Sequence, residues 1–145
     1  MMRRPPAFAL LLLLFAAVVS GCGSNDSSDP TKVVESWSQA INASDDDTAA
    51  NLFAPAAVVI QDGSQTTLKG KPEALAFNSS LPCGGKIVKT STEGNEVTAT
   101  FTLTRRPGHM CDGTGEAAIA EFRINDGKIT LWHQLPPVGT TTQAA

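Results

Sequence analysis

Several residue types and patterns are missing from this 145-residue chain, and each absence excludes a class of function. There is no tyrosine, so no phenolic hydroxyl can act as an acid or as an oxyanion donor. No extended basic block exists, and acidic residues outnumber basic ones by 14 to 11, which disfavours nucleic acid as a partner. The longest apolar run has about a dozen residues, whereas a membrane-spanning helix needs about 20.

The N-terminus has the pattern of a secretory signal that ends in a cysteine. Arginines precede the uncharged apolar run 7–18, and the small residues 19–21 lead to Cys22. This order resembles the bacterial lipobox, in which the cysteine is diacylated and becomes the new N-terminus. The alternative is an ordinary secretory signal followed by an unmodified cysteine. We predict a lipoprotein signal peptide over residues 1–21 and a protein anchored by lipid on Cys22 at the extracytoplasmic face of a bacterial cell membrane.

The chain after this signal is long enough for one domain. It has about 124 residues and a net charge of about −5. Residues 22–29 are mostly Gly, Ser, Asn and Asp, which predicts a flexible tether. Residues 138–145 are predicted to form a disordered tail. We therefore expect a single folded domain over residues 30–137.

Two further cysteines, Cys83 and Cys111, are predicted to form a disulfide, because two thiols in an oxidising compartment usually pair. The bridge would close a loop of about 28 residues and contribute about 3 kcal/mol. A metal site made by both cysteines with His109 and Asp112 is the alternative. We expect the disulfide, with no metal and no cofactor.

Local patterns predict helices first and strands later. Asp29 and Pro30 begin a helix, and the acids 45–47 begin a second one that ends near Phe53. A strand from Ala57 to Gln61, a turn at Asp62-Gly63 and a returning strand follow, and then a third helix begins at Gly70. Period-two alternation predicts four more strands, at 86–93, 97–104, 115–124 and 128–135. This order predicts an α+β fold, with three helices on one face of a curved, mainly antiparallel sheet.

Three segments resemble the nuclear transport factor 2-like domain of the SnoaL-like type. They are Ala49–Val58, Leu68–Ala74 and Asp126–Trp132. The resemblance spans about residues 29–136 and implies a cone with a pocket between the helices and the sheet. Enzymes, binding domains and inert relatives share this fold, so the resemblance alone implies no activity.

Known enzymes of this fold depend on residues that this chain lacks. Limonene epoxide hydrolases carry Trp-Arg-Asp on the last strand, and the matching positions here are Trp132, His133 and Gln134. The amide of Gln134 cannot take a proton near neutral pH. Ketosteroid isomerases use a tyrosine and an aspartate base, and this chain has no tyrosine. The remaining candidates for an acid or base are His133 and Asp62.

The last strand supports two interpretations of which face lines the pocket. The resemblance implies that Thr130, Trp132 and Gln134 face it. Alternation of apolar residues instead turns the odd-numbered positions of 129–135 inward, including His133. We favour the first interpretation. The predicted pocket residues are Trp37, Gln61, Phe77, Phe101, Phe122, Trp132 and Gln134.

These observations favour binding over catalysis. We expect a membrane-anchored domain that binds a small apolar or amphipathic ligand, or a protein partner, without converting it. The alternative is a pocket enzyme of isomerase or hydrolase type that uses His133 or Asp62. A third hypothesis is a structural or accessory lipoprotein that works by association, as a homodimer through the sheet. Arg105 and Arg106 are predicted to form a solvated rim, with an anion clamp as the alternative. The large aromatic residues are expected to form the core.

Overall fold

A computed structural model describes residues 29–137, which form three helices and six strands. The predicted signal peptide, Cys22 and the C-terminal tail lie outside the described residues. Within residues 29–137 no helix is long and apolar enough to cross a membrane. The elements in chain order are α1 Pro30–Asn42, α2 Asp46–Asn51, β1 Phe53–Gln61, β2 Ser64–Thr67, α3 Lys71–Ser80, β3 Gly84–Glu93, β4 Glu96–Thr104, β5 Ala117–Asn125 and β6 Lys128–Leu135.

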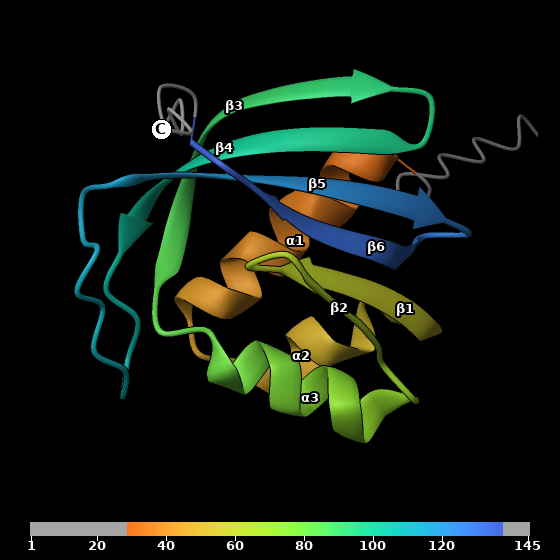
Figure 1. Ribbon diagram of the computed structural model, residues 1–145, viewed down its shortest axis with the longest axis horizontal. Coiled ribbons are helices and arrows are strands. Elements are labelled where there is room, and N and C mark those ends of the chain that lie inside the picture. The colour runs from red at the N-terminus through yellow and green to blue at the C-terminus, as the bar shows by residue number, and fades with distance from the viewer. Residues whose placement is uncertain (1–28, 138–145) are drawn as a thin grey trace, which may run out of the picture.

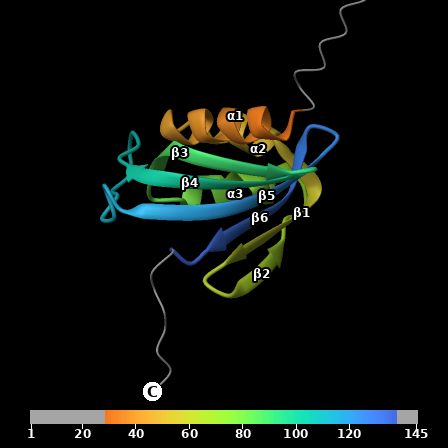
Figure 2. The ribbon, with the colours of Figure 1, turned by 90° about the horizontal axis from the view of Figure 1, so that it is seen from above.

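The six strands form one sheet in the order β2-β1-β6-β5-β4-β3. Every neighbouring pair is antiparallel except β1 and β6, which run parallel. The sheet curves around α1, and α2 and α3 lie together beside β1 (Figures 1 and 2). The predicted α+β fold, with three helices on a mainly antiparallel sheet, is therefore confirmed.

Acidic residues begin the first two helices, as the sequence predicts. The side chain of Asp29 accepts a hydrogen bond from the backbone N–H of Thr31, and Pro30 occupies the first turn. Asp45 accepts from both the hydroxyl and the backbone N–H of Thr48, at 2.7 and 3.1 Å. These two bonds hold the pKa of the Asp45 carboxyl below its ordinary value. Each helix therefore starts where its capping side chain satisfies a free backbone donor.

The boundary between α2 and β1 differs from the sequence prediction. The helix ends at Asn51 and the strand begins at Phe53, four residues before the predicted start at Ala57. Pro55 therefore lies inside the strand. The register of β1 against β6 shifts between Phe53 and Val58, so Pro55 falls in a stretch with no regular ladder. A strand tolerates proline there because no ladder bond needs its missing N–H.

An aromatic cluster around Trp37 forms the centre of the core. The Trp37 ring lies 5.2 Å from the Phe122 ring and 6.2 Å from the Phe101 ring, measured between ring centroids. Its indole N–H donates to the side-chain oxygen of Asn78 on α3 at 2.8 Å. The Asn78 amide in turn donates to the backbone oxygen of Ala74 at 2.7 Å, so this fully buried polar side chain is satisfied.

The prediction that Arg106 lies on a solvated rim is wrong. Arg106 is 2% exposed and its guanidinium contacts two segments of the chain, residues 44–46 and 78–81. One terminal nitrogen donates to the backbone oxygens of Asn78 and Leu81, each at 3.0 Å. Nε donates to the Ser44 hydroxyl at 3.2 Å, and the other terminal nitrogen forms an ion pair with Asp46. Buried charge is tolerated here because the guanidinium is paired and hydrogen-bonded.

Replacing Arg106 with methionine should reduce the free energy of unfolding by about 3–5 kcal/mol, because a half-buried carboxylate and two backbone oxygens lose their donor. Urea unfolding of the two chains measures the difference. The matched control is Arg105→Met, whose exposed side chain should change stability by less than about 0.5 kcal/mol. Equal losses at both positions would contradict the role assigned to Arg106.

Candidate functional site

A cavity of about 190 Å³ lies between α1 and the inner face of the sheet. Its lining comes from α1, from the segment that joins α3 to β3, and from strands β1, β3, β4, β5 and β6. The lining is mainly apolar, and its larger contributors are Trp37, Ile41, Leu81, Phe101, Leu103 and Trp132. The cavity is therefore suited to apolar contacts.

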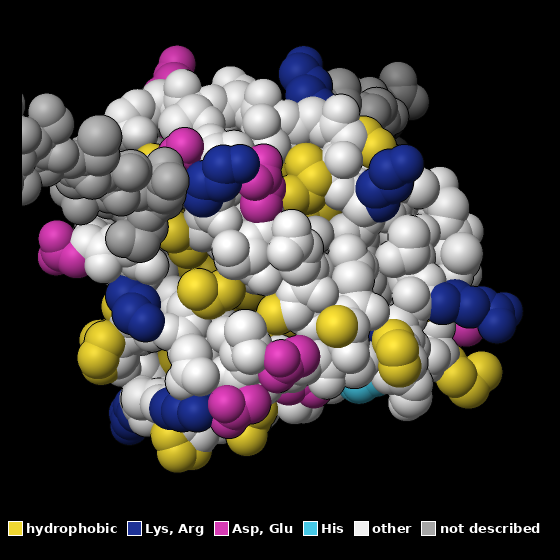
Figure 3. All heavy atoms as spheres, turned by 180° about the vertical axis from the view of Figure 1, so that it is seen from behind, with side chains coloured by type: hydrophobic (Ala, Val, Ile, Leu, Met, Phe, Trp, Pro, Cys, Tyr) yellow, Lys and Arg dark blue, Asp and Glu magenta, His cyan; other side chains and the backbone are white. Residues whose placement is uncertain are grey.

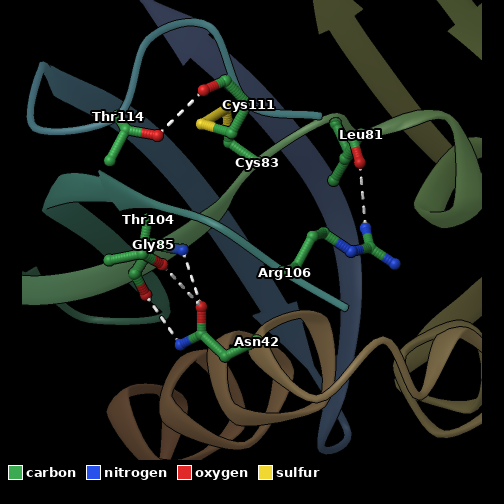
Figure 4. Close-up of a disulfide and its surroundings, with 8 residues drawn as sticks. All are labelled: Asn42, Leu81, Cys83, Gly85, Thr104, Arg106, Cys111 and Thr114. Atoms are coloured by element: carbon green, nitrogen blue, oxygen red, sulfur yellow. Dashed lines mark hydrogen bonds between the residues drawn. A yellow bond between two sulfur atoms is a disulfide. The ribbon is translucent and has the colours of Figure 1, made fainter. Parts of the chain in front are cut away.

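Two glycines at the start of β3 let the backbone approach α1 and β4 closely. A Cβ on Gly84 would lie 2.3 Å from the side-chain oxygen of Asn42, and a Cβ on Gly85 would lie 2.9 Å from the Phe101 ring. The Asn42 side chain accepts from Gly85 N at 2.8 Å and donates to Gly85 O at 3.0 Å (Figure 4). In the sequence these glycines follow the third helix and predict only where that helix ends. Their second role depends on α1, which is about 40 residues away in sequence, so no local signal reveals it.

The predicted disulfide between Cys83 and Cys111 is present. It joins the start of β3 to the long loop between β4 and β5 (Figure 4), and Cys83 lines the cavity. The pairing occupies both thiols that the alternative metal site would need. Among residues 29–137 no group of three or more His, Cys, Asp or Glu side chains could hold a metal ion.

The structure brings five of the seven predicted pocket residues together. Those that line the cavity are Trp37, Gln61, Phe101, Trp132 and Gln134. Phe122 is fully buried in the core behind Trp37. Phe77 packs against the other side of Trp132, at 5.1 Å between ring centroids, and lines a second hollow between α3 and the β1–β2 hairpin. These two residues support the cavity from behind without lining it.

An irregularity in β6 explains why the two interpretations of this strand conflict. Arg123 of β5 pairs with Leu131, but the next residue, Ile124, pairs with Ile129, so Thr130 is an extra residue on β6. Ile129 and Trp132 are consequently both buried. Thr130 does not reach the cavity, because its hydroxyl donates to the backbone oxygen of Arg123 at 3.1 Å. The resemblance therefore placed Trp132 and Gln134 on the cavity side and was wrong only for Thr130.

Neither acid–base candidate lines the cavity. His133 lies between two cavity-lining residues on β6, so its side chain is on the opposite face of the sheet, and its backbone is in register with Glu121 of the neighbouring strand β5. Asp62 is exposed in the turn of the β1–β2 hairpin, with a left-handed φ of 50°. Among the residues that line the cavity, all of them within 29–137, none is Asp, Glu, His, Lys or Arg.

The polar groups of the cavity are few and neutral. The Ser38 hydroxyl donates to the backbone oxygen of Gly85 at 2.8 Å and is therefore occupied. Gln61 and Gln134 contribute carboxamides from neighbouring strands. On the surface opposite to the view of Figure 1, charges of both signs are scattered among polar and apolar side chains (Figure 3). That face offers no single-sign patch among the described residues.

Comparison with known protein families agrees with this architecture. Residues 34–132 match the SnoaL-like domain, which is more than half of the chain. The chain belongs to the SnoaL-like domain family. No protein with a curated description matches the sequence.

Solved structures share the fold of this SnoaL-like domain at low sequence identity. An NTF2-like protein of unknown function from Cytophaga hutchinsonii is 16% identical, with a TM-score of 0.61 over 74% of this chain and 88% of that chain. A candidate polyketide cyclase from Sinorhizobium meliloti is 19% identical, with a TM-score of 0.57 over 72% and 94%. A candidate ketosteroid isomerase from Kribbella flavida is 16% identical, with a TM-score of 0.58 over 80% and 87%. At these identities the comparison shows the fold alone.

Proposed function

We propose that this SnoaL-like domain is held by lipid at the extracytoplasmic face of a bacterial membrane and binds a small apolar or amphipathic molecule without converting it. The observation that carries the binding function is the cavity between α1 and the sheet. Its walls are apolar and none of its lining side chains titrates. General acid–base catalysis needs a titratable group within hydrogen-bond reach of the substrate, so this lining supports binding over turnover.

Filling part of the cavity should weaken binding. Ala118 lines the cavity from β5, and its neighbour Ala117 is exposed and lies on the other side of that strand. Ala118→Leu should weaken toluene binding by about tenfold or more, because the added carbons take space that the ligand would fill, at about 0.8 kcal/mol per methylene. Trp37 and Trp132 both line the cavity, so their fluorescence measures the titration.

Ala117→Leu is the matched control and should bind toluene as the unmodified chain does. Equal affinities in all three chains would contradict binding in this cavity. A native mass spectrum of the protein purified without reduction gives a second measurement, because a bound molecule adds a mass that is lost on gentle heating.

A pocket enzyme is the second candidate, and it is suggested by the cyclase and isomerase descriptions of two fold relatives. It would have to use His133 or Asp62, which lie away from the cavity lining. That arrangement favours the binding function. Turnover of a co-purified molecule, lost in His133→Gln, would instead support the enzyme.

The membrane anchor is proposed from the sequence around Cys22. Small residues precede this cysteine, an apolar run precedes them, and acyl chains on the thiol would hold the domain at the membrane surface. The full chain, expressed in a bacterium supplied with an alkyne fatty acid, should carry the label, and Cys22→Ala should not. A double variant, Cys83→Ala with Cys111→Ala, is the control. It should still be labelled, because the two cysteines it lacks form the disulfide and Cys22 is unchanged. Label that persists in Cys22→Ala would contradict lipidation at this site.

Association through the sheet is a further proposal, supported by the outer face of β1 and β6. Val58, Ile60, Leu131 and Leu135 lie there around His133, and all are only half-buried in the single chain. Apolar side chains gathered on one face are typical of surfaces that bind a partner. Ile60→Glu should convert a dimer to a monomer in light scattering, whereas Thr102→Glu, on the outer face of β4 away from these residues, should not. A monomer mass for the unmodified chain at high concentration would overturn the homodimer.

A further inference from the structure

The second hollow, between α3 and the β1–β2 hairpin, shares a border with the cavity. It holds about 490 Å³ and is more open to solvent than the cavity of about 190 Å³. Gln61, the last residue of β1, lines both spaces. The ring of Phe77 on the hollow side packs against the ring of Trp132 on the cavity side. A molecule that passes the side chain of Gln61 can therefore occupy both spaces.

One face of α3 runs along the two spaces. Glu73 and Phe77 line the hollow, and Leu81, which directly follows the helix, lines the cavity. These positions are four residues apart, and such positions lie on the same face of a helix. At a rise of about 1.5 Å per residue, Glu73 lies about 12 Å from Leu81 along this face. A ligand that extends from the cavity to Glu73 is therefore elongated.

The hollow differs from the cavity in charge. No side chain that lines the cavity is charged, whereas Glu73 lines the hollow. One oxygen of this carboxylate accepts a hydrogen bond from the backbone N–H of Lys69 at 2.7 Å, which holds the side chain at the start of α3. Within residues 29–137 Glu73 forms no ion pair, and the nearby Lys71 pairs with Asp47 instead. The carboxylate can therefore pair with a cation from a ligand.

A carboxylate next to an aromatic ring suits an ammonium group. Glu73 supplies the opposite charge, and Phe77, one helical turn further on, supplies a ring for a cation–π contact. The hydroxyls of Ser64 and Thr66 also line the hollow and can accept hydrogen bonds. Because the hollow is open, the ammonium keeps part of its hydration and its charge is not fully buried. An anionic group would instead meet the like charge of Glu73.

We propose that the hollow is the head-group subsite of the cavity and that the ligand is an elongated alkylammonium ion. Its apolar end fills the cavity, and its ammonium lies between Glu73 and Phe77. This inference rests on the proposed binding function and deepens it by naming the ligand class. The apolar end is limited to a single ring or one short chain, because a cavity of about 150 Å³ accepts benzene and drug-sized ligands occupy about 300 Å³ or more.

Three probes with similar alkyl chains test the charge of the ligand. At neutral pH octylammonium is a cation, 1-octanol is neutral and octanoate is an anion. The protein is the chain from Gly23 onward, which retains every residue of the described fold, and the fluorescence of Trp37 and Trp132 measures binding. The unmodified chain should prefer octylammonium to octanol. That preference should fall about threefold to fivefold in Glu73→Gln, which removes the charge and keeps an oxygen for the Lys69 N–H.

Glu121→Gln is the matched control for the change in net charge. Glu121 follows the cavity-lining Ala120 on β5, so its side chain lies on the opposite face of the sheet. This variant should keep the full preference for octylammonium. An equal loss of preference in Glu73→Gln and Glu121→Gln would overturn the contact with Glu73, because it would reflect only the overall charge.

Filling the hollow tests whether both spaces form one site. Ala76 lines the hollow from α3, whereas Ser79 is exposed on the same helix and does not line it. Ala76→Phe should weaken octylammonium about fivefold, because the ammonium no longer reaches Glu73 and Phe77. Toluene, which needs only the cavity, should bind this variant within about twofold of the unmodified chain. Ser79→Phe is the control and should bind both probes normally.

Proton–nitrogen spectra of the unmodified chain supply a measurement that does not depend on any variant. Octylammonium should shift the backbone signals of Glu73 in the hollow and of Gly85 in the cavity wall. Toluene should shift the Gly85 signal and leave the Glu73 signal nearly unchanged. An octylammonium shift confined to Gly85 would overturn the head-group subsite.

The outcomes separate the inference from the function on which it rests. If toluene binds and octylammonium binds Ala76→Phe as well as the unmodified chain, the hollow is not part of the site while cavity binding stands. Tighter binding of octanoate than of octylammonium would overturn the cationic class. If toluene binds and none of the octyl probes does, the elongated ligand is overturned. If toluene also fails to bind, the binding function itself falls.

Discussion

The buried guanidinium of Arg106 is the constraint on which the site depends. It joins the start of α2, the end of α3 and the end of β4 through an ion pair and hydrogen bonds. One of its acceptors is the backbone of Asn78, whose side chain holds the indole of Trp37. A single charge that must be satisfied thus fixes α3 relative to the sheet and, through Asn78, orients an aromatic wall of the cavity.

The cavity exists because large and small side chains meet across it. Aromatic rings from α1, β4 and β6 face alanines of β5 and the glycines that begin β3. Gly85 brings β3 against the Phe101 ring, and the disulfide of Cys83 fastens the adjoining segment to the β4–β5 loop. Rigid anchors on both sides of the space keep it from collapsing, which is what a pre-formed binding site requires.

Much of the candidate site could be predicted from residue type and order, because a chain with few aromatic residues uses them in one cluster. Trp37, Phe101 and Trp132 line the cavity as expected, but Phe77 and Phe122 lie behind it. Which ring faces the space and which supports it depends on contacts between elements far apart in sequence. The pairing of the two indoles could not be predicted either, since only the packed core shows that the Trp37 N–H donates to Asn78 and that the Trp132 N–H has no partner among the described residues.

The sequence by itself determined the elements whose signals are local: the Asp29 cap, the hairpin turn at Asp62, the alternating strands and the pairing of Cys83 with Cys111. Tertiary structure decided what depends on distant partners. Arg105 and Arg106 are chemically identical neighbours. Only Arg106 reaches a carboxylate and backbone oxygens, and these contacts compensate for removing its charge from water. The extra residue on β6 likewise decided which of its side chains face the cavity. Side chains alternate between the two faces of a strand only where its pairing with the neighbouring strand is regular, and the pairing of β6 with β5 is interrupted there.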